Sequence, residues 1–213
     1  MKMGPPLFTI VCTVFERANL FPHLLWSVLQ QTFEDWELVV LEDGEHPRVR
    51  QAVDHLRERV PETTHNVTLV PMFGPQGRVG KYGNPLRRRG LELARGRYVC
   101  WVNHDNLLHP GFLKAHMRNF EDQPEGVSLV NVDYFAQEMY YMGKTPRGWR
   151  GIEALEAGDL DLLNFAVPAQ AAREHGLFAP AHDALPAAWW PGLQSLMRVV
   201  PTCHYRATVA ARF

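Results

Sequence analysis

The sequence has few cysteines, no excess of charge of either sign and no long apolar run. Its 213 residues include three cysteines, Cys12, Cys100 and Cys203, which lie far apart without C-x-x-C spacing. This argues against a disulfide framework or a thiolate zinc site, and it indicates small buried thiols in a reducing cytosol. Lys and Arg together number 22, and Asp and Glu number 23. The chain therefore lacks the basic excess typical of a protein that binds nucleic acid.

Apolar stretches are too short to cross a bilayer. The longest one near the start covers residues 7–15 and continues directly into Glu16 and Arg17. A transmembrane helix needs about 20 apolar residues, and a signal peptide needs a small-residue cleavage site, which this stretch lacks. We therefore expect a cytoplasmic protein without a transmembrane segment. Its 46 % hydrophobic and 21 % charged residues are typical of a globular domain.

Two phosphate-binding motifs are missing. The segment G-R-V-G-K-Y at 77–82 resembles a P-loop, but Pro75 stands where its first glycine is needed and Tyr82 where its hydroxyl is needed. No G-x-G-x-x-G follows the first predicted strand either. The sequence therefore excludes a P-loop NTPase and gives no dinucleotide fingerprint.

Strand and helix patterns alternate along the first 135 residues. Continuous β-branched and apolar runs predict buried strands at 7–15, 36–41, 67–72, 97–102 and 127–135. Helical spacing predicts helices at 20–31, 47–59, 86–94 and 110–120, with Asn19 as the N-cap of the first. Residues 187–197 and 199–205 predict a last helix and strand. This alternation is typical of an open α/β sheet with helices on both faces.

Ligands of open α/β sheets bind beyond the carboxyl ends of the strands. Polar residues follow several predicted strands there: Glu16 and Arg17, Glu42 and Asp43, the 74–85 loop with Arg78 and Lys81, and the segment 103–106. Carboxylates suit a divalent cation or the N–H of a base, whereas the loop cations suit phosphate. Solvated loop cations are the alternative for Arg78 and Lys81.

Two long segments of the sequence carry a resemblance to a known family. The first is T-V-F-E-R followed by S-V-L-Q-Q-T-F-E-D-W-E-L-V-V-L-E-D-G, and the second is G-L-E-L-A-R-G-R-Y-V-C-W-V-N-H-D-N-L-L-H-P. The first resembles the start, and the second the D-x-D region, of family 2 glycosyltransferases, which are inverting enzymes that use nucleotide sugars. The resemblance covers about residues 7–120. It implies a GT-A fold, which is an α/β, Rossmann-like and mostly parallel sheet flanked by helices, with a less regular C-terminal acceptor region.

The resemblance also implies roles for particular residues. It assigns nucleotide binding to Thr13, Phe15, Glu16, Asp43, Arg78, Lys81 and His104. Asp43 is expected to accept a hydrogen bond from the base of a nucleoside diphosphate, most simply UDP. Asp105, in an exposed cleft, is expected to hold Mn²⁺ or Mg²⁺. The alternative for His104 is a loop imidazole that only makes a hydrogen bond.

The acceptor side departs from the family pattern. Trp189 stands where the catalytic Asp is expected, and Asp183 is the nearest substitute for a general base, with Asp161 and Glu174 next. A silent nucleotide-sugar-binding module is therefore the alternative to an active transferase. Trp189 and Trp190 are interpreted as a sugar-stacking floor or as core.

The remaining assignments concern the domain limits and the partners. We expect a nucleotide-sugar-binding half at 1–135 and an acceptor-side region at 136–213 that completes the same domain. The acceptor is an unknown glycan, lipid or small molecule, and a peripheral contact with a membrane stays open. The run Arg87, Arg88 and Arg89 predicts a solvated helix face with one salt bridge. His204, at the end of a predicted strand, is interpreted as a structural histidine rather than a metal ligand.

Overall fold

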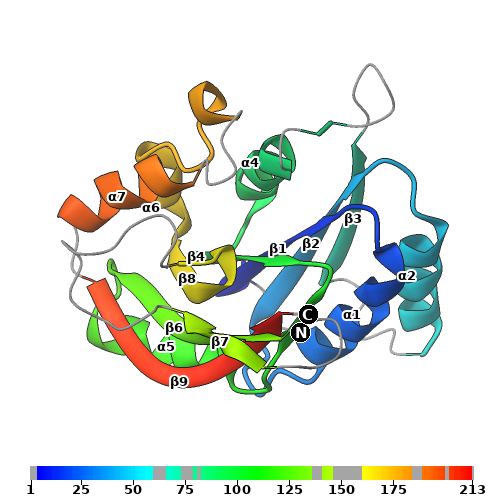
Figure 1. The fold of residues 1–213 in the computed structure, drawn as a ribbon, viewed down its shortest axis with the longest axis horizontal. Helices are drawn as coiled ribbons and strands as arrows, with labels where there is room; N and C mark the ends of the chain where they lie inside the picture. Colours follow the sequence, from blue (N-terminus) through cyan, green and yellow to red (C-terminus); the bar gives the residue numbers. More distant parts are fainter. Residues whose placement is uncertain are drawn as a thin grey trace.

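The computed structural model describes residues 4–59, 66–72, 79–80, 83–135, 141–145, 160–183, 189–199 and 202–212. The described part of the chain forms helices packed against one mixed sheet (Figure 1). No helix in this part is long and apolar enough to cross a membrane.

The sheet holds nine strands of the described chain in the order β3-β2-β1-β4-β8-β6-β9-β5, with β7 paired to β6. Their bounds are β1 Phe8–Val14, β2 Trp36–Asp43, β3 Val67–Met72, β4 Tyr98–Asn103, β5 Asn106–Leu108, β6 Val127–Phe135, β7 Tyr141–Thr145, β8 Phe165–Pro168 and β9 Thr202–Arg212. The strands β3, β2, β1 and β4 are parallel to one another. Strand β8 lies between β4 and β6 and is antiparallel to both.

Helices cover both faces of the sheet. Their bounds are α1 Phe21–Leu29, α2 Pro47–Arg59, α4 Asn84–Leu93, α5 Phe112–Asp122, α6 Ala169–Glu174 and α7 Trp190–Val199, with 3₁₀ turns η1 Ala18–Leu20, η4 Leu162–Asn164 and η5 Pro180–His182. Helices α1, α2 and α5 share one apolar core with the sheet, and α4, α6 and α7 share the other. Figure 1 shows these two groups on opposite sides of the strands.

Helix α4 lies unusually close to the centre of the sheet. A Cβ added at Gly90 would stand 2.2 Å from Val11 Cγ1, which is well inside van der Waals contact. Glycine at this position therefore lets the α4 backbone approach β1 directly. This close approach brings the first turn of α4 to the carboxyl ends of β1 and β4, where Arg87 bonds to Asn103.

The alternation predicted from the sequence is confirmed for the first half of the chain. The predicted strands match β1, β2, β3, β4 and β6, and the predicted helices match α1, α2, α4 and α5. The N-cap at Asn19 is wrong, because Asn19 lies within η1 and Leu20 precedes α1 without a side-chain cap. Strands β5, β7 and β8 and helix α6 were not predicted, since they are too short to show a periodic pattern.

Candidate functional site

The ends of three parallel strands meet at one edge of the sheet. Thr13 lies opposite Asn103 in the β1–β4 register, and Val14 lies opposite Glu42 in the β1–β2 register. The hydroxyl of Thr13 donates to Asn103 Oδ1 across 3.1 Å. Because β1 and β4 are parallel neighbours, residues that are 90 positions apart in the sequence form one polar surface here. The strand-end residue Asn103 therefore lies beside Thr13, which the resemblance assigns to nucleotide binding.

Asp43 closes the end of β2 and holds a loop. It is 4 % exposed, and its carboxylate accepts hydrogen bonds from the backbone N–H groups of Val79 and Gly80, the latter at 3.1 Å. Gly80 has φ of 64°, which favours glycine. Asp43 thus fixes the backbone at Val79 and Gly80. Arg78 and Lys81, which the resemblance assigns to nucleotide binding, lie outside the described part of the chain. A carboxylate has about four acceptor positions, so Asp43 can also accept from a ligand.

Arg87 brings a buried positive charge to the same edge. It is 8 % exposed, and its guanidinium donates to Asn84 Oδ1 at 3.1 Å and to Asn103 Oδ1 at 3.2 Å. The prediction of a solvated arginine face is therefore wrong for Arg87 and holds for Arg89, which pairs with Glu92. Helical spacing is the signal that could have found it, because Arg87 shares a face with Asn84 and Leu91, both of which are buried.

Asp105 follows β4 and is paired with Arg17. Arg17 Nη2 lies 2.7 Å from Asp105 Oδ2, and the two side chains are 54 % and 6 % exposed, respectively. Asp105 Oδ1 is buried and has no hydrogen-bond partner among the described residues. The turn that aims Arg17 back over the strands includes Glu16 at φ of 50°, a conformation rare outside glycine and asparagine. The expected exposed cleft at Asp105 is wrong, since the carboxylate is buried under this ion pair.

His104 is tied to the end of β1. Its backbone N–H donates to the carbonyl of Thr13 at 3.2 Å, and its ring Nδ1 lies 3.3 Å from the same oxygen. Burial lowers the pKa of His104, and the neighbouring Asp105 partly offsets this effect. The ring is therefore neutral at pH 7, and Nδ1 is its protonated nitrogen because a carbonyl can only accept. Its Nε2 is then a free acceptor, buried and without a partner in the described chain.

Glu42 points away from this edge. Alternation along β2 puts it on the sheet face that α1 and α2 cover, opposite to Asp43. It is 1 % exposed, and neither carboxylate oxygen has a hydrogen-bond partner in the described chain. Burial raises the pKa of Glu42, while His46 and Arg50 partly offset that rise. The pairing of Glu42 with Asp43 in the sequence therefore does not mean a shared ligand site.

The described residues suit a divalent cation only when a ligand brings most of the coordination. They contain no group of three His, Cys, Asp or Glu side chains that could hold a metal. They do offer one buried carboxylate oxygen without a partner, Asp105 Oδ1. Mg²⁺ is commonly bound by one or two carboxylates together with waters and the phosphates of a substrate. Asp105 fits that kind of site.

Asp183 lies beside α4 rather than at the strand ends. Arg88 donates to its two carboxylate oxygens at 2.8 and 3.2 Å and to the carbonyl of Phe178 at 2.9 Å. The amide of Asn84 donates to the carbonyl of Asp183 at 3.3 Å. A chain of hydrogen bonds therefore runs from Thr13 through Asn103, Arg87 and Asn84 to Asp183, and it links the two regions.

The other residues considered for the acceptor side have structural partners. Trp189 is buried and packs on Phe165 with ring centroids 5.3 Å apart, so it belongs to the core. Asp161 caps η4 by accepting from the N–H of Leu163, and Glu174 accepts from Gln170 on the surface.

Two of the predicted nucleotide-binding residues lie just beyond β1, where Phe15 is half-buried and Glu16 is exposed. The side chain of His204 lies outside the described residues.

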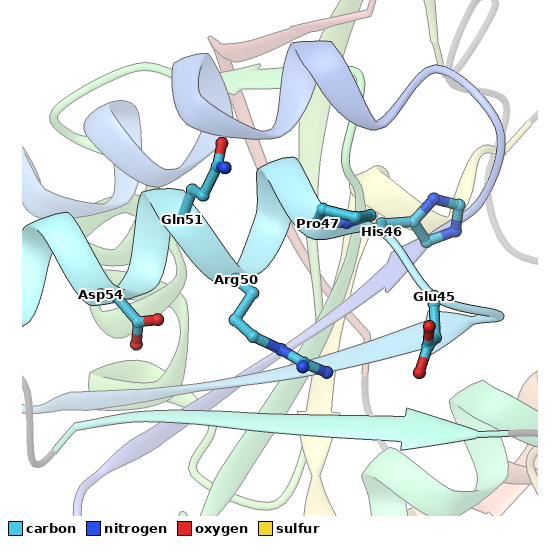
Figure 2. A pocket seen from close by; sticks show the side chains of 6 residues that line it. All are labelled: Glu45, His46, Pro47, Arg50, Gln51 and Asp54. Carbon is cyan, nitrogen blue, oxygen red and sulfur yellow. The ribbon is translucent and has the colours of Figure 1, made fainter.

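A surface pocket is lined by residues other than the predicted site residues. It has a volume of about 230 Å³ and is formed by the turn after β2 and the first half of α2 (Figure 2). Its lining residues are Glu45, His46, Pro47, Arg50, Gln51 and Asp54. Figure 2 shows Gln51 and Arg50 pointing to different sides of α2, and Glu45 and His46 on the turn that precedes this helix. None of the predicted site residues lines it, but its lining residue His46 lies close enough to His104 to lower the pKa of that residue.

Comparison with known proteins identifies the family. Residues 9–178, which are more than half of the chain, match the sequence model of glycosyl transferase family 2. The chain belongs to this family, and the resemblance seen in the sequence is confirmed. It is similar to a glucosyl-dolichyl phosphate glucuronosyltransferase of Haloferax volcanii, with 26 % identity over 66 % of this chain and 45 % of that protein. It is also similar to a putative teichuronic acid biosynthesis glycosyltransferase, TuaG, of Bacillus subtilis, with 22 % identity over 65 % of this chain and 51 % of that protein.

Solved structures confirm the GT-A fold. Residues 1–349 of S. aureus TarS in complex with UDP match with a TM-score of 0.73 and 14 % identity, over 96 % of this chain and 59 % of that one. A mannosyltransferase of Pyrobaculum calidifontis in complex with GDP-Man and Mn²⁺ matches with a TM-score of 0.64 and 16 % identity, over 99 % of this chain and 57 % of that one. The chain thus spans about half the length of the proteins it resembles.

Proposed function

We propose that the chain transfers a sugar from a nucleotide-diphosphate sugar, most simply a UDP-sugar, to an acceptor with inversion at the sugar. The observation that carries this proposal is that Asp43 lies at the carboxyl end of β2 and Asn103 and Asp105 at that of β4, the two parallel strands that flank β1. In sheets of this kind the carboxyl edge is where ligands bind. UDP and GDP-Man occupy structural neighbours of the same fold, which supports a nucleotide-diphosphate donor for this chain.

The donor's base and its diphosphate would meet different parts of this edge. Asp43 would accept the N–H of the base, while its hold on Val79 and Gly80 keeps the adjacent loop in place. Thr13, Phe15 and Glu16 would border the nucleoside beyond β1. Arg78 and Lys81 would approach the diphosphate from the loop, and His104, with Nε2 unpartnered, would accept a donor hydroxyl.

Cleavage of the sugar–phosphate bond leaves negative charge on the diphosphate. Asp105 would hold a Mn²⁺ or Mg²⁺ ion, and such an ion would stabilise that charge as a Lewis acid. The protein's own part is to present one carboxylate at a fixed position, since β4 and the bond between the Asn103 N–H and Asn106 Oδ1, 2.6 Å long, define the turn that carries Asp105. A preorganised charge of this kind need not rearrange during the reaction.

Asp183 is our proposed general base. Inversion needs a carboxylate that takes the acceptor's proton on the sugar face opposite the diphosphate. Asp183 accepts from Arg88 through both oxygens, and each oxygen keeps a further acceptor position for an acceptor hydroxyl. This arrangement also favours a second candidate function, a silent nucleotide-sugar-binding module in which Asp183 only fastens residues 178–183 to α4.

The acceptor and the setting of the reaction follow from the same proposal. Residues 1–135 would bind the nucleotide sugar, and residues 136–213 would complete the domain and bind a glycan, lipid or small-molecule acceptor. The protein would act in the cytoplasm, with a peripheral membrane contact where the acceptor is a lipid.

Hydrolysis of the donor tests the proposal without knowledge of the acceptor. A panel of UDP- and GDP-sugars is incubated with the protein and Mn²⁺, and release of the nucleoside diphosphate is followed by chromatography. We expect slow release from at least one donor, and loss of that release in Asp43→Asn. Tight donor binding without release, and without transfer to any acceptor tried, would favour the silent module. Absence of both binding and release would contradict the proposal.

A further inference from the structure

Asp105 and Arg17 form an ion pair in which the two partners differ sharply in exposure. The carboxylate is almost buried, with 6 % exposure, whereas the guanidinium side chain is 54 % exposed. A buried carboxylate without a counter-ion is strongly unfavourable, so Asp105 needs a positive partner in the protein without nucleotide. Arg17 supplies that partner at 2.7 Å.

The position of Arg17 is built rather than incidental. Glu16 adopts a positive φ of 50°, and the N–H of Ala18 donates to the carbonyl of Glu16, which closes a tight turn directly after β1. Unusual backbone conformations of this kind persist where the surrounding structure fixes them, and they cluster at functional sites. The turn directs Arg17 toward the first residues after β4, where the resemblance places the metal ligand.

A cation at Asp105 would compete with Arg17. The described residues offer no group of three metal-binding side chains, so a divalent ion gains little from the protein alone. An ion that arrives with a nucleoside diphosphate brings phosphate ligands with it. The same phosphates offer the displaced guanidinium a new partner, because arginine binds phosphate oxygens in the same bidentate way as carboxylate oxygens.

From this we infer that Arg17 is an exchangeable counter-ion: it neutralises Asp105 in the nucleotide-free protein and moves to the diphosphate of the donor when the metal–nucleotide complex takes Asp105. The inference rests on the proposed function and deepens it, because it adds Arg17 to the residues that bind the diphosphate. It also implies an order of binding, in which the metal ion alone binds weakly and the nucleotide makes metal binding favourable.

Binding of Mn²⁺ without nucleotide provides the first test. Arg17→Gln removes the competitor and is expected to tighten Mn²⁺ binding at Asp105 by about 10- to 100-fold, the range contributed by one hydrogen bond to a charged group. Free and bound Mn²⁺ are measured by electron paramagnetic resonance. The double variant Arg17→Gln/Asp105→Asn gives the background of unspecific binding. Arg57→Gln is a matched control, because Arg57 is also an arginine with 50 % side-chain exposure in a 2.9 Å ion pair.

Binding of UDP without metal provides the second test, by calorimetry. Arg17→Gln is expected to weaken metal-free UDP binding about tenfold or more, whereas Arg17→Lys keeps the charge and loses less. Asp105→Asn, which frees Arg17 in the folded protein, is expected to strengthen it. Unchanged Mn²⁺ affinity in folded Arg17→Gln, or unchanged or weaker metal-free UDP binding in Asp105→Asn, would overturn the exchange. Failure of the parent protein to bind any nucleoside diphosphate would instead overturn the proposed function, and it would leave the Mn²⁺ result as a separate finding.

Discussion

Arg88 donates hydrogen bonds to both carboxylate oxygens of Asp183, at 2.8 and 3.2 Å. The adjacent Arg87 donates instead to Asn103 at the strand ends. Two consecutive residues of α4 therefore contact two different regions, the strand ends and residues 178–183. Gly90 allows this, because it lets α4 lie directly against β1. Helix α4 thus links the proposed donor site to the proposed general base.

Asp183→Asn tests the role of the proposed base. If Asp183 takes the acceptor's proton, the variant loses transfer by roughly 10²- to 10⁴-fold while donor binding stays unchanged, because the role begins only when an acceptor is present. Transfer is measured with an acceptor found by screening, and donor binding by calorimetry. Glu174→Gln is the control, since Glu174 is an exposed carboxylate bonded to Gln170. Equal transfer in Asp183→Asn and the parent would show that another group takes the proton.

Gly90→Ala tests the close packing of α4 on β1. A Cβ there would lie 2.2 Å from Val11 Cγ1, and overpacking of this kind costs about 1–3 kcal/mol. For a chain of this size each 1 kcal/mol lowers Tm by about 2–4 °C, so calorimetry should show a clear decrease. The double variant Gly90→Ala/Val11→Ala removes the clashing methyl group. It should lose less stability than the sum of the two single variants, and strict additivity would contradict the packing.

His116 predicts part of the acid sensitivity of the fold. It is fully buried, its Nδ1 lies 2.8 Å from Ser128 Oγ, and burial lowers its pKa to about 3. In the unfolded chain His116 therefore binds a proton below about pH 6.5, whereas in the folded chain it stays neutral down to about pH 3. Between these two pH values the free energy of unfolding therefore decreases, through His116, by about 1.4 kcal/mol for each pH unit by which the pH is lowered.

Urea unfolding of the parent and of His116→Asn at pH 7, 6 and 5 isolates this contribution. The parent should lose more stability over this range than the variant does, whatever their difference at pH 7. Parallel pH profiles of the two proteins would show that His116 does not titrate as the structure indicates.

The sequence predicts most of the first half of the fold because its patterns are local. Continuous apolar runs such as Phe8–Val14 and helical spacing such as that of Pro47–Arg59 depend only on neighbouring residues. The candidate strand-end residues Asp43 and Asp105 follow from where those runs stop, whereas Thr13 follows from the resemblance to the family. The sequence could not show that Asp105 is buried under Arg17, since that pairing joins residues 88 positions apart.

The acceptor side was harder to predict for the same reason. Strand β8 is only 4 residues long and pairs antiparallel with β4, a partner that lies far away in the sequence. The sequence indicates Asp183 only through its short distance from Trp189 along the chain, and only the folded structure shows that Arg88 binds it. Arg87 and Arg88 look alike in the sequence, yet the helix turns one toward the strand ends and the other toward residues 178–183.

Binding of nucleoside diphosphates is the most direct test of the account. UDP, GDP, TDP and CDP are each titrated with Mn²⁺ into the parent protein and into Asp43→Asn, with thermal unfolding as the readout. A ligand at about 100 times its Kd adds about 2.7 kcal/mol to the stability of the folded state. The account predicts a saturable rise in Tm for at least one nucleotide and a markedly smaller rise in Asp43→Asn. No rise with any of the four nucleotides, or an equal rise in both proteins, would contradict a nucleotide site centred on Asp43.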